Sequence, residues 1–532
     1  MNYYSYISTK AAWDCIQTIF LCVPGKYAKD AGSAEQYARE SGWVQTAEDS
    51  AAVLVVPVTE NWQETDVSWI PDFYDKHKND FRAPGGVSIP GRDGTLWLWE
   101  TMIYLVGYED GADYAAKVLT AHPGFFAGSL IANGQIRSYE NADAEASHWF
   151  VRTPTDYHRT NRQIPSAVWL AKVFDEKTVS YFKTTACADS VKEENYGSVR
   201  TTVSYCSANP AQEVRISYEI PDAETVMDTF FEHTLRWKNS PDGELRNYIG
   251  KKDWPDTERF AHYSVSTDGQ NYPYSVYLPE GMTRENMPEL PLVFSIHGRG
   301  EPAWVFAEKN GWQALADETK EFMAVFPDSP YNIWQIGRDR TAVKAMLEDI
   351  CKNYRVDCTR VYLTGFSNGA IFTCQQASTF PELFAAASPW NGPGIEACRK
   401  MGIDDYVYEE HFKDSGYEMP MMIFVGDSDG KASSYREDEL DILLKANHCS
   451  RDTEKILGEE YYTAEKGYTQ GDRFYTRVFR DENNVVKTGL TVMKNMPHGA
   501  IWDESRAAWN FLKQFRRTDR NKQAEVVERE LV

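Results

Sequence analysis

The chain has 532 residues, of which 42% are hydrophobic and 25% charged, and its net charge is −23 at pH 7. This apolar fraction excludes a disordered chain, and the length predicts two or three domains. A strongly acidic surface repels phosphate backbones and anionic lipids, so we expect neither nucleic acid nor membrane as a partner. No apolar run approaches the ~18 residues of a membrane span.

The nine cysteines show no C-x-x-C spacing and no Cys/His cluster, so we expect no metal site and no cofactor. Their odd number fits buried thiols in a reducing compartment. The N-terminal stretch has no basic region before its apolar run IQTIFLCV, which is also short for a signal peptide. We therefore expect a cytoplasmic protein.

Two parts of the chain repeat each other. Residues 104–134 align without gaps on residues 362–392, and ten positions are identical. Upstream, residues 42–63 parallel residues 311–335, and the buried strands TIFLCVPG and LVFSIHG precede them. This pattern indicates a tandem duplication.

Each copy alternates short apolar strands with amphipathic helices, which predicts a mostly parallel sheet flanked by helices. The expected fold class is α/β, with two such domains in tandem. The second copy opens on a predicted hairpin with the turn Asp268-Gly269. The predicted boundaries are a first domain at 1–240, a linker at 241–261, a second domain at 262–516 and a charged tail, expected as a frayed helix, at 517–532.

Ser367 lies in the segment VYLTGFSNGAIF, where a predicted strand runs into a G-x-S-x-G turn and then a helix. Such an elbow lifts the serine hydroxyl above the sheet, and the flanking residues must be small because their backbones nearly touch. The following helix N-terminus favours negative charge at the site. The context predicts a nucleophile rather than a tight turn that merely contains serine.

A serine nucleophile needs a base and an acid. In the fold that carries a strand–turn–helix elbow of this kind, the chain order is Ser, then Asp or Glu, then His. His498 lies in a loop between a predicted strand and the last helix, where the base belongs. The strand PMMIFVG is followed by two candidate acids, Asp427 and Asp429, of which we prefer Asp429.

The oxyanion formed in such a reaction needs two positioned N–H donors. The backbone N–H of Asn368, next after the serine, is the first candidate. The loop His297-Gly298-Arg299-Gly300 supplies the second, for which Arg299 is preferred and Gly298 is the second choice. His297 is expected to support this loop rather than act as a second base.

Taken together, residues about 262–515 resemble the polyhydroxybutyrate depolymerase/feruloyl esterase group of α/β hydrolases. The motifs that carry the resemblance are PLVFSIHGRG, NIWQ, YRVDCTRVYLTGFSNGA, VGDSDG and MPHGAIW. The resemblance implies an α/β-hydrolase fold for the second domain, carboxylic ester hydrolysis through an acyl-enzyme, and Asp429 as the acid. The repeat extends this fold to the first domain, so we expect tandem α/β-hydrolase domains. It also places Trp334 and Trp502 near the cleft.

The sequence leaves the acyl group open. Trp334, Trp390 and Trp502, with Trp304, either line an aromatic-friendly pocket or belong to the core. The predicted substrate is a small soluble ester, such as an aryl or feruloyl ester or a hydroxyalkanoate oligomer. The alternatives are a serine peptidase or an acyltransferase of the same fold, and a non-catalytic protein of two paired binding domains.

The first copy has lost the catalytic residues. Glu109 stands at the serine position and Asp110 at the oxyanion position. Asp175 and Glu176 could supply an acid, but His233 falls too late in the chain to be the base. We interpret this copy as a degenerate, non-catalytic domain that packs on the active one, walls its cleft, forms a homodimer or simply adds stability.

Overall fold

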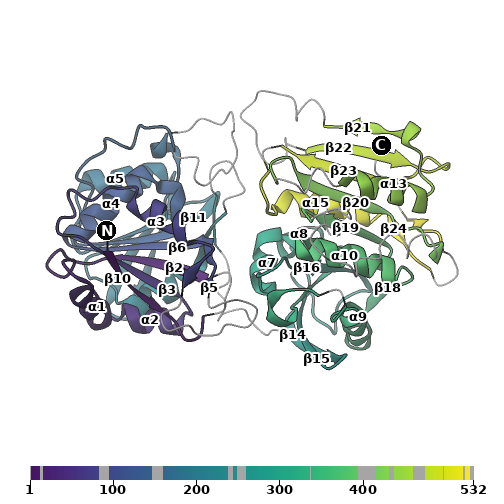
Figure 1. Cartoon of the computed structure of the whole chain (residues 1–532), viewed down its shortest axis with the longest axis horizontal. Helices are drawn as coiled ribbons and strands as arrows, with labels where there is room; N and C mark the ends of the chain where they lie inside the picture. The colour runs from purple at the N-terminus through teal and green to yellow at the C-terminus, as the bar shows by residue number, and fades with distance from the viewer. Residues whose placement is uncertain are drawn as a thin grey trace. The chain divides into compact units, whose positions relative to one another are not determined.

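The protein divides into two compact units, Met1–Asp253 and Trp254–Val532, each built on one large sheet (Figure 1). The computed structural model describes residues 2–11, 16–82, 95–146, 160–237, 244–247, 259–335, 337–392, 415–429, 436–458, 474–494, 496–518 and 522–527. The boundary between the units falls inside the linker predicted from the sequence.

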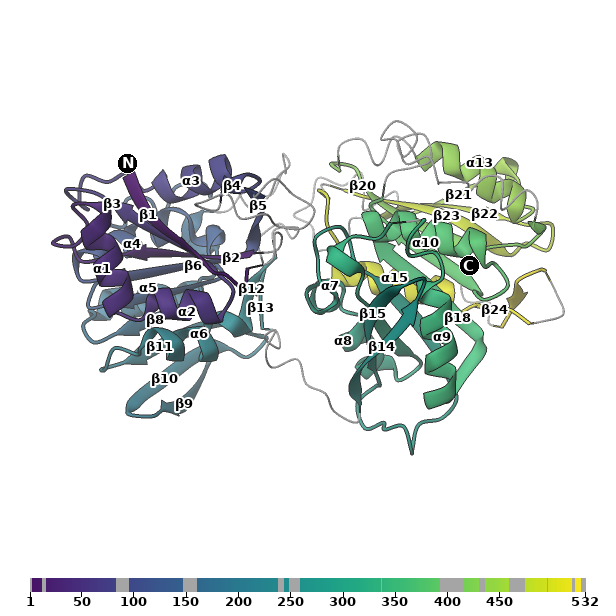
Figure 2. The ribbon, with the colours of Figure 1, turned by 60° about the horizontal axis from the view of Figure 1, so that its bottom comes forward.

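The first unit has a nine-stranded sheet within the described residues. In spatial order its strands are β1 (Asn2–Ile7), β3 (Val53–Val58), β2 (Ile16–Cys22), β6 (Leu98–Tyr108), β7 (Gly128–Ala132), β8 (Val168–Ala171), β11 (Asn209–Ser217), β10 (Val199–Cys206) and β9 (Ser190–Tyr196). Its helices are α1 (Ala31–Glu40), α2 (Trp43–Asp49), α3 (Trp69–His77), α4 (Asp110–Ala121), α5 (Glu176–Thr185) and α6 (Ala223–Thr229). Figure 2 shows β9 and β10 at the outer edge of this sheet. Two short hairpins complete the unit, β4 (Phe81–Arg82) with β5 (Thr95–Leu96), and β12 (Thr234–Arg236) with β13 (Leu245–Asn247).

The second unit has a ten-stranded sheet within the described residues. In spatial order its strands are β14 (Phe260–Thr267), β15 (Gln270–Tyr277), β17 (Met323–Pro327), β16 (Leu290–Ile296), β18 (Val356–Phe366), β19 (Ala386–Trp390), β20 (Met421–Gly426), β23 (Val486–Met493), β22 (Phe474–Arg480) and β21 (Lys455–Leu457). Its helices are α7 (Ala303–Asn310), α8 (Trp312–Thr319), α9 (Ala342–Asn353), α10 (Asn368–Thr379), α13 (Arg436–Ala446) and α15 (Trp502–Leu512). The hairpin of β14 and β15 around Asp268-Gly269 confirms that prediction.

The two sheets share one strand order. The parallel series β3-β2-β6-β7-β8-β11 of the first unit corresponds to β17-β16-β18-β19-β20-β23 of the second, and in both an antiparallel pair extends the far end. The ladders also agree in register, since Cys22 lies opposite Gly107 and Ile296 lies opposite Gly365. The fold class is therefore α/β, with two domains of the same topology, as the sequence repeat predicts.

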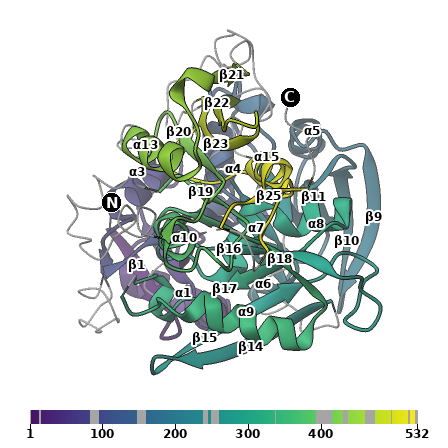
Figure 3. The ribbon, with the colours of Figure 1, turned by 90° about the vertical axis from the view of Figure 1, so that its right-hand side faces the viewer.

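Buried side chains cover both faces of the second sheet, as expected for a parallel sheet between helix layers. One core cluster joins the sheet to α9, α10 and α13, and the other joins it to α7, α8 and α15. Helix α9 runs beside the hairpin strand β14 (Figure 3).

The ends of both units differ from their predicted form. The tail predicted as a frayed helix instead forms a hairpin, β24 (Phe515–Arg516) with β25 (Glu525–Val526). It is held because the buried guanidinium of Arg517 donates to the carbonyl of Phe384, at 2.7 Å. The first unit has a similar contact, in which the buried Arg236 on β12 donates to the carbonyl of Phe126 at 2.6 Å. Strand β12 pairs with β13, which lies inside the predicted linker. The charge of these arginines predicts exposure to solvent, whereas the structure buries them against backbone carbonyls, partners that the sequence does not reveal.

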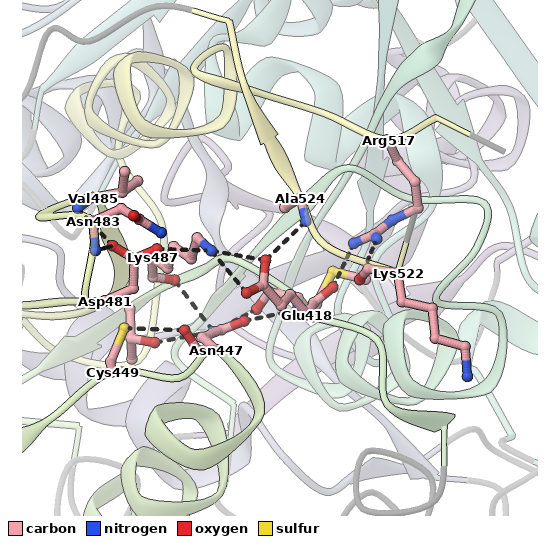
Figure 4. Close-up of polar contacts among 12 residues, drawn as sticks. Glu418, Asn447, Cys449, Asp481, Asn483, Val485, Lys487, Arg517, Lys522 and Ala524 are labelled. Carbon is pink, nitrogen blue, oxygen red and sulfur yellow. Dashed lines mark hydrogen bonds and ion pairs between the residues drawn. The ribbon is translucent and has the colours of Figure 1, made fainter. Parts of the chain in front are cut away.

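A buried ion network holds the last strands of the second unit to this tail (Figure 4). Lys487 on β23 contacts Glu418 at 2.8 Å and Asp481 at 3.0 Å, and Glu418 also accepts from the N–H of Ala524 at 2.9 Å. All three charged side chains are buried. The attraction between them offsets the cost of removing each from water only while all partners are present.

Replacing Lys487 with Met should destabilise the second unit by about 3–5 kcal/mol, because two buried carboxylates lose their cation. Urea unfolding at pH 7 measures the loss. The matched control is Arg506→Ala, which breaks an exposed pair with Glu318 and should cost less than about 1 kcal/mol. Equal effects of the two substitutions would contradict the role given to the buried network.

Candidate active site

Ser367 sits at a strained turn between β18 and α10. Its backbone has φ 55° and ψ −115°, in a region that non-glycine residues rarely adopt. Its N–H donates to the carbonyl of Trp390 at 2.9 Å, which fixes the turn over the sheet. A Cβ on Gly365 would overlap Gly369, and one on Gly369 would overlap the carbonyl oxygens of Ile296 and His297. The close approach of these backbones explains the two glycines of the motif.

Gly369→Ala should therefore destabilise the second unit by about 3 kcal/mol, because the added methyl meets backbone that cannot rotate away. Thermal unfolding followed by circular dichroism measures it. Gly111→Ala is the matched control, since a Cβ there would overlap the carbonyls of Cys22 and Val23 in the first unit. That variant should lose comparable stability in the first unit while the second unit keeps its unfolding transition. Wild-type stability for Gly369→Ala would refute the packing argument.

Ser367, His498 and Asp429 form a hydrogen-bonded line. The Nε2 atom of His498 lies 2.8 Å from the Ser367 Oγ, and its Nδ1 lies 2.8 and 2.9 Å from the two carboxylate oxygens of Asp429. An ionised carboxylate only accepts hydrogen bonds, so Nδ1 carries the proton and Nε2 can accept from the serine hydroxyl. The His498 side chain is 46% exposed and that of Asp429 only 8%.

The two candidate acids occupy different places. Asp429 faces His498, whereas Asp427 accepts a hydrogen bond from the hydroxyl of Ser428 at 2.8 Å. The N–H of Asp427 also continues the sheet, donating to the carbonyl of Met493 at 3.0 Å. Of the two, the geometry brings Asp429 to the histidine.

Asn391 joins the acid and histidine loops and was missed in the sequence. It is fully buried, its Oδ1 accepts from the N–H of Gly426 at 2.6 Å, and its Nδ2 donates to the carbonyl of Gly499 at 2.7 Å. It thus connects the end of the strand before Asp429 to the residue after His498. The signal was present, because Asn391 and Asn133 are identical in the repeat, and both have positive φ.

The loop after β16 is held from below by His297. Its Nε2 accepts from the N–H of Ser329 at 3.1 Å, so Nδ1 carries the proton and donates to the carbonyl of Gly298 at 2.6 Å. In a trans peptide the N–H points away from the C=O, so the N–H of Arg299 points away from His297. Burial lowers the pKa of His297, which keeps the imidazole neutral. The ring is a support for the loop, as predicted.

Asn368 follows the elbow as the first residue of α10, so its N–H has no partner within the helix. Its side chain is engaged elsewhere: Oδ1 accepts from the N–H of Trp334 at 2.8 Å, and Nδ2 donates to the carbonyl of Trp334 at 3.1 Å. This pair of bonds fixes the segment of Trp334 beside the elbow.

The predicted pocket tryptophans occupy three different environments. Trp390 is 0% exposed, stacks on Trp312 and belongs to the core, so its prediction as a pocket residue is wrong. Trp334 lies beside the elbow but is only 2% exposed and stacks on Phe372. Trp502 is 37% exposed, and its indole donates to the carbonyl of Glu308 at 3.0 Å. A pocket role for Trp334 and Trp502 stays a prediction.

The first unit keeps the elbow but not the catalytic residues. Glu109 has φ 55° and ψ −125°, and its N–H donates to the carbonyl of Ala132 at 3.0 Å. The strand registers place Glu176 at the position of the acid, because Ala171 lies opposite Ala132 as Phe424 lies opposite Trp390. The other predicted candidate, Asp175, caps α5 by accepting from the N–H of Thr178 at 2.6 Å.

Asp110, the residue after Glu109, binds the loop that follows β2. Its Oδ1 accepts from the N–H of Gly25 at 2.7 Å. Gly25 is three residues after Cys22, as Arg299 is three after Ile296, and those two strand ends pair identically with the elbow strands. The carboxylate of Asp110 thus accepts a hydrogen bond from the N–H that corresponds to that of Arg299.

Neither a metal cluster nor a spanning helix is found in the described ranges. No group of three or more His, Cys, Asp or Glu side chains is placed there to hold a metal ion. None of the helices in those ranges is both long and apolar enough to cross a membrane.

Comparison with known proteins places the similarity in the second unit. Residues 272–397 match the model of a family described as "Esterase PHB depolymerase". A poly(3-hydroxyalkanoate) depolymerase C of Paucimonas lemoignei is 31% identical over 152 residues, covering 26% of this chain and 35% of the relative. A bifunctional acetylxylan esterase/xylanase of Neocallimastix patriciarum is 31% identical over 129 residues, covering 24% of this chain and 18% of the relative.

The match thus spans about a third or less of each of these relatives. Among solved structures, an acetyl xylan esterase from Aspergillus awamori shows 18% identity and a TM-score of 0.37, with 48% of this chain and 99% of that chain covered. Over the matched residues, which include the elbow, the second unit is similar to polyhydroxybutyrate depolymerase-like α/β hydrolases, and the first unit precedes it with the same strand order.

Proposed function

We propose that this protein is a serine carboxylic-ester hydrolase that works through an acyl-enzyme. The observation that carries the proposal is the hydrogen-bonded line from Ser367 through His498 to Asp429, with the serine on a strained elbow at a helix N-terminus. A serine hydroxyl becomes a nucleophile when a base stands within hydrogen-bond reach and a third group orients that base. Both conditions are met here.

In the proposed reaction, Ser367 Oγ attacks the ester carbonyl while His498 Nε2 takes its proton. Asp429 holds the imidazole by Nδ1 and stabilises the imidazolium. His498 then gives the proton to the leaving alcohol, and the acyl group stays on Ser367. A water molecule, deprotonated by the same histidine, attacks the acyl-enzyme and restores the serine.

The backbone N–H groups of Asn368 and Arg299 are the proposed oxyanion donors. The first opens α10, and the second points away from the carbonyl that His297 holds. The contact between Asp110 and Gly25 supports Arg299 over Gly298, because in the first unit the corresponding N–H binds a negatively charged oxygen. That oxygen belongs to Asp110, which follows the elbow residue Glu109. In the proposed reaction the oxyanion would form on the substrate bound to Ser367, the corresponding elbow residue.

The proposed substrate is a small soluble ester. The relatives in the comparison are described as a poly(3-hydroxyalkanoate) depolymerase and as acetylxylan esterases, which favours acetyl and hydroxyalkanoate esters, with aryl esters as the further candidate. The exposed imidazole of His498 fits a site that is open to solvent. Because Trp390 belongs to the core, the case for an aryl pocket rests on Trp334 and Trp502 alone.

The first unit is proposed as a non-catalytic domain. It has glutamate in place of serine at the elbow, its sequence has no histidine where the base should lie, and the carboxylate of Asp110 accepts from the N–H of Gly25. A homodimer through this unit and a cytoplasmic location remain predictions of the sequence.

The proposal is tested with 4-nitrophenyl acetate, 4-nitrophenyl butyrate, methyl ferulate and a hydroxybutyrate dimer, together with a fluorophosphonate probe that labels activated serines. We expect turnover of at least one ester and labelling of the peptide that contains Ser367. Adding excess methanol and quantifying methyl esters distinguishes an acyltransferase from a hydrolase. No turnover combined with no labelling would contradict a serine hydrolase and favour a binding protein.

A further inference from the structure

Two cysteines of the second unit face each other across the connection from α9 to β18. The Sγ atoms of Cys351 and Cys358 lie 3.1 Å apart. A disulfide bond is about 2.05 Å long, so roughly 1 Å of side-chain movement separates this pair from a covalent bond. A small rotation of the two side chains is enough to provide it.

The backbone on both sides of the pair is fixed by regular structure. Cys351 lies in the last turn of α9, and Cys358 lies near the start of β18. Between them, the buried Tyr354 donates its N–H to the carbonyl of Ile350 at 2.9 Å, and its hydroxyl lies 2.8 Å from that of Tyr263. The short separation of the sulfurs is therefore a property of the packed fold.

The start of β18, where Cys358 lies, is irregular. Its pairing with β16 shifts register between Val356 and Val361, so Cys358 lies in an irregular part of the strand. Cys358 is exposed and Cys351 is half-buried behind it. An external reagent thus reaches Cys358 first and finds a second thiol within contact distance.

We propose that Cys351 and Cys358 form a reversible disulfide by exchange with a low-molecular-weight disulfide such as oxidised glutathione. The Cys358 thiolate attacks one glutathione sulfur, and one glutathione thiolate leaves. The Cys351 thiolate then attacks the Cys358 sulfur of this mixed disulfide, and the second glutathione leaves. The two protein thiols lose two protons and two electrons, and oxidised glutathione becomes two reduced molecules.

The closing step, in which Cys351 attacks, depends on pH. Burial, together with the neighbouring thiol, raises the pKa of Cys351 to about 12, so its thiolate is scarce near pH 7. The closing step should therefore speed up about tenfold for each pH unit between 7 and 9, since the thiolate is the attacking species.

The bond would fix α9 to β18 without reaching the proposed catalytic residues. Cys358 and Ser367 lie near opposite ends of β18, nine residues and roughly 30 Å apart along the strand. The closed loop runs from residue 351 to 358, and closing a loop of this size should raise the Tm of the second unit by about 5–10 °C. Ester hydrolysis should be unchanged. The inference does not depend on the proposed function.

Tryptic mapping tests the proposal on the full-length protein. Cleavage after Lys352 and Arg355 separates AMLEDICK (345–352) from VDCTR (356–360), so only a disulfide keeps these peptides together. After incubation with oxidised glutathione and blocking with N-ethylmaleimide, we expect the linked pair, which reduction separates. Two separately alkylated peptides, or two glutathione adducts, would overturn the proposal.

One variant and one internal control complete the test. Cys351→Ser should stop the reaction at a glutathione adduct on Cys358 and abolish the rise in Tm. Cys187, an exposed cysteine of the first unit, serves as an internal control that forms a glutathione adduct only. A linked pair in which Cys358 is joined to another cysteine would also overturn the assignment.

Discussion

Ser367→Ala should reduce kcat for ester hydrolysis by about 10⁴–10⁶-fold, because the residue that would form the acyl-enzyme is lost. The substitution removes one hydroxyl that donates to His498, and alanine adopts the elbow conformation at a cost similar to that of serine. Folding should therefore be unaffected. Initial rates with the best ester of the panel, and labelling by the fluorophosphonate probe, measure the effect.

Glu109→Ala is the matched control for this experiment. Glu109 occupies the elbow of the first unit with nearly the same backbone angles, φ 55° and ψ −125°. If the first unit is non-catalytic, this variant should keep wild-type rates. Activity of Ser367→Ala within about tenfold of wild type would place the nucleophile elsewhere, since tenfold corresponds to only about 1.4 kcal/mol in the barrier. A loss for Glu109→Ala instead would give the first unit a part in the reaction.

The sequence contained most of the fold because its two copies repeat the same order of strands and helices. Alternation of buried strands and amphipathic helices predicts parallel sheets, and the matched glycines around Ser367 and Glu109 reflect backbones that touch. The order along the chain pointed to Ser367 and His498, and the family resemblance selected Asp429 over Asp427; the structure joins these three residues by hydrogen bonds.

Other features depended on partners far away in the chain. The sequence left Trp390 open as a pocket or a core residue. In the structure it ends β19, its side chain is buried in the core, and its carbonyl accepts from the N–H of Ser367. The tail looked solvated because it is rich in charge, but Arg517 is buried against main-chain carbonyls. The contact between Arg517 and Phe384 joins residues 133 positions apart, which leaves no local pattern to read.

The first unit keeps the elbow with different side chains on it. Asp110 stands where the second unit has Asn368, and its carboxylate accepts from the N–H of Gly25. A negative charge at a helix N-terminus is favourable, which gives this arrangement a structural reason to remain. We therefore interpret the elbow of the first unit as a structural feature that this contact stabilises.

Asp429→Asn should lower kcat by about 10⁴-fold with little change in KM, because the carboxylate that selects the histidine tautomer is lost. An asparagine amide can donate to Nδ1, which shifts the proton to Nε2 and prevents His498 from accepting the serine proton. The Nδ1 contacts at 2.8 and 2.9 Å make this the acid with the largest expected effect. Steady-state kinetics from pH 6 to 9 measure both parameters.

Asp427→Asn is the matched control, two residues away in the same loop. Asparagine keeps an oxygen that can accept from the Ser428 hydroxyl, so the loop should hold its shape and kcat should stay within about threefold of wild type, a change under 1 kcal/mol. The contrast separates the electrostatic role of one carboxylate from damage to the loop that carries both. If Asp427→Asn lost as much activity as Asp429→Asn, the effect would belong to the loop, and the assignment of Asp429 as the orienting acid would be wrong.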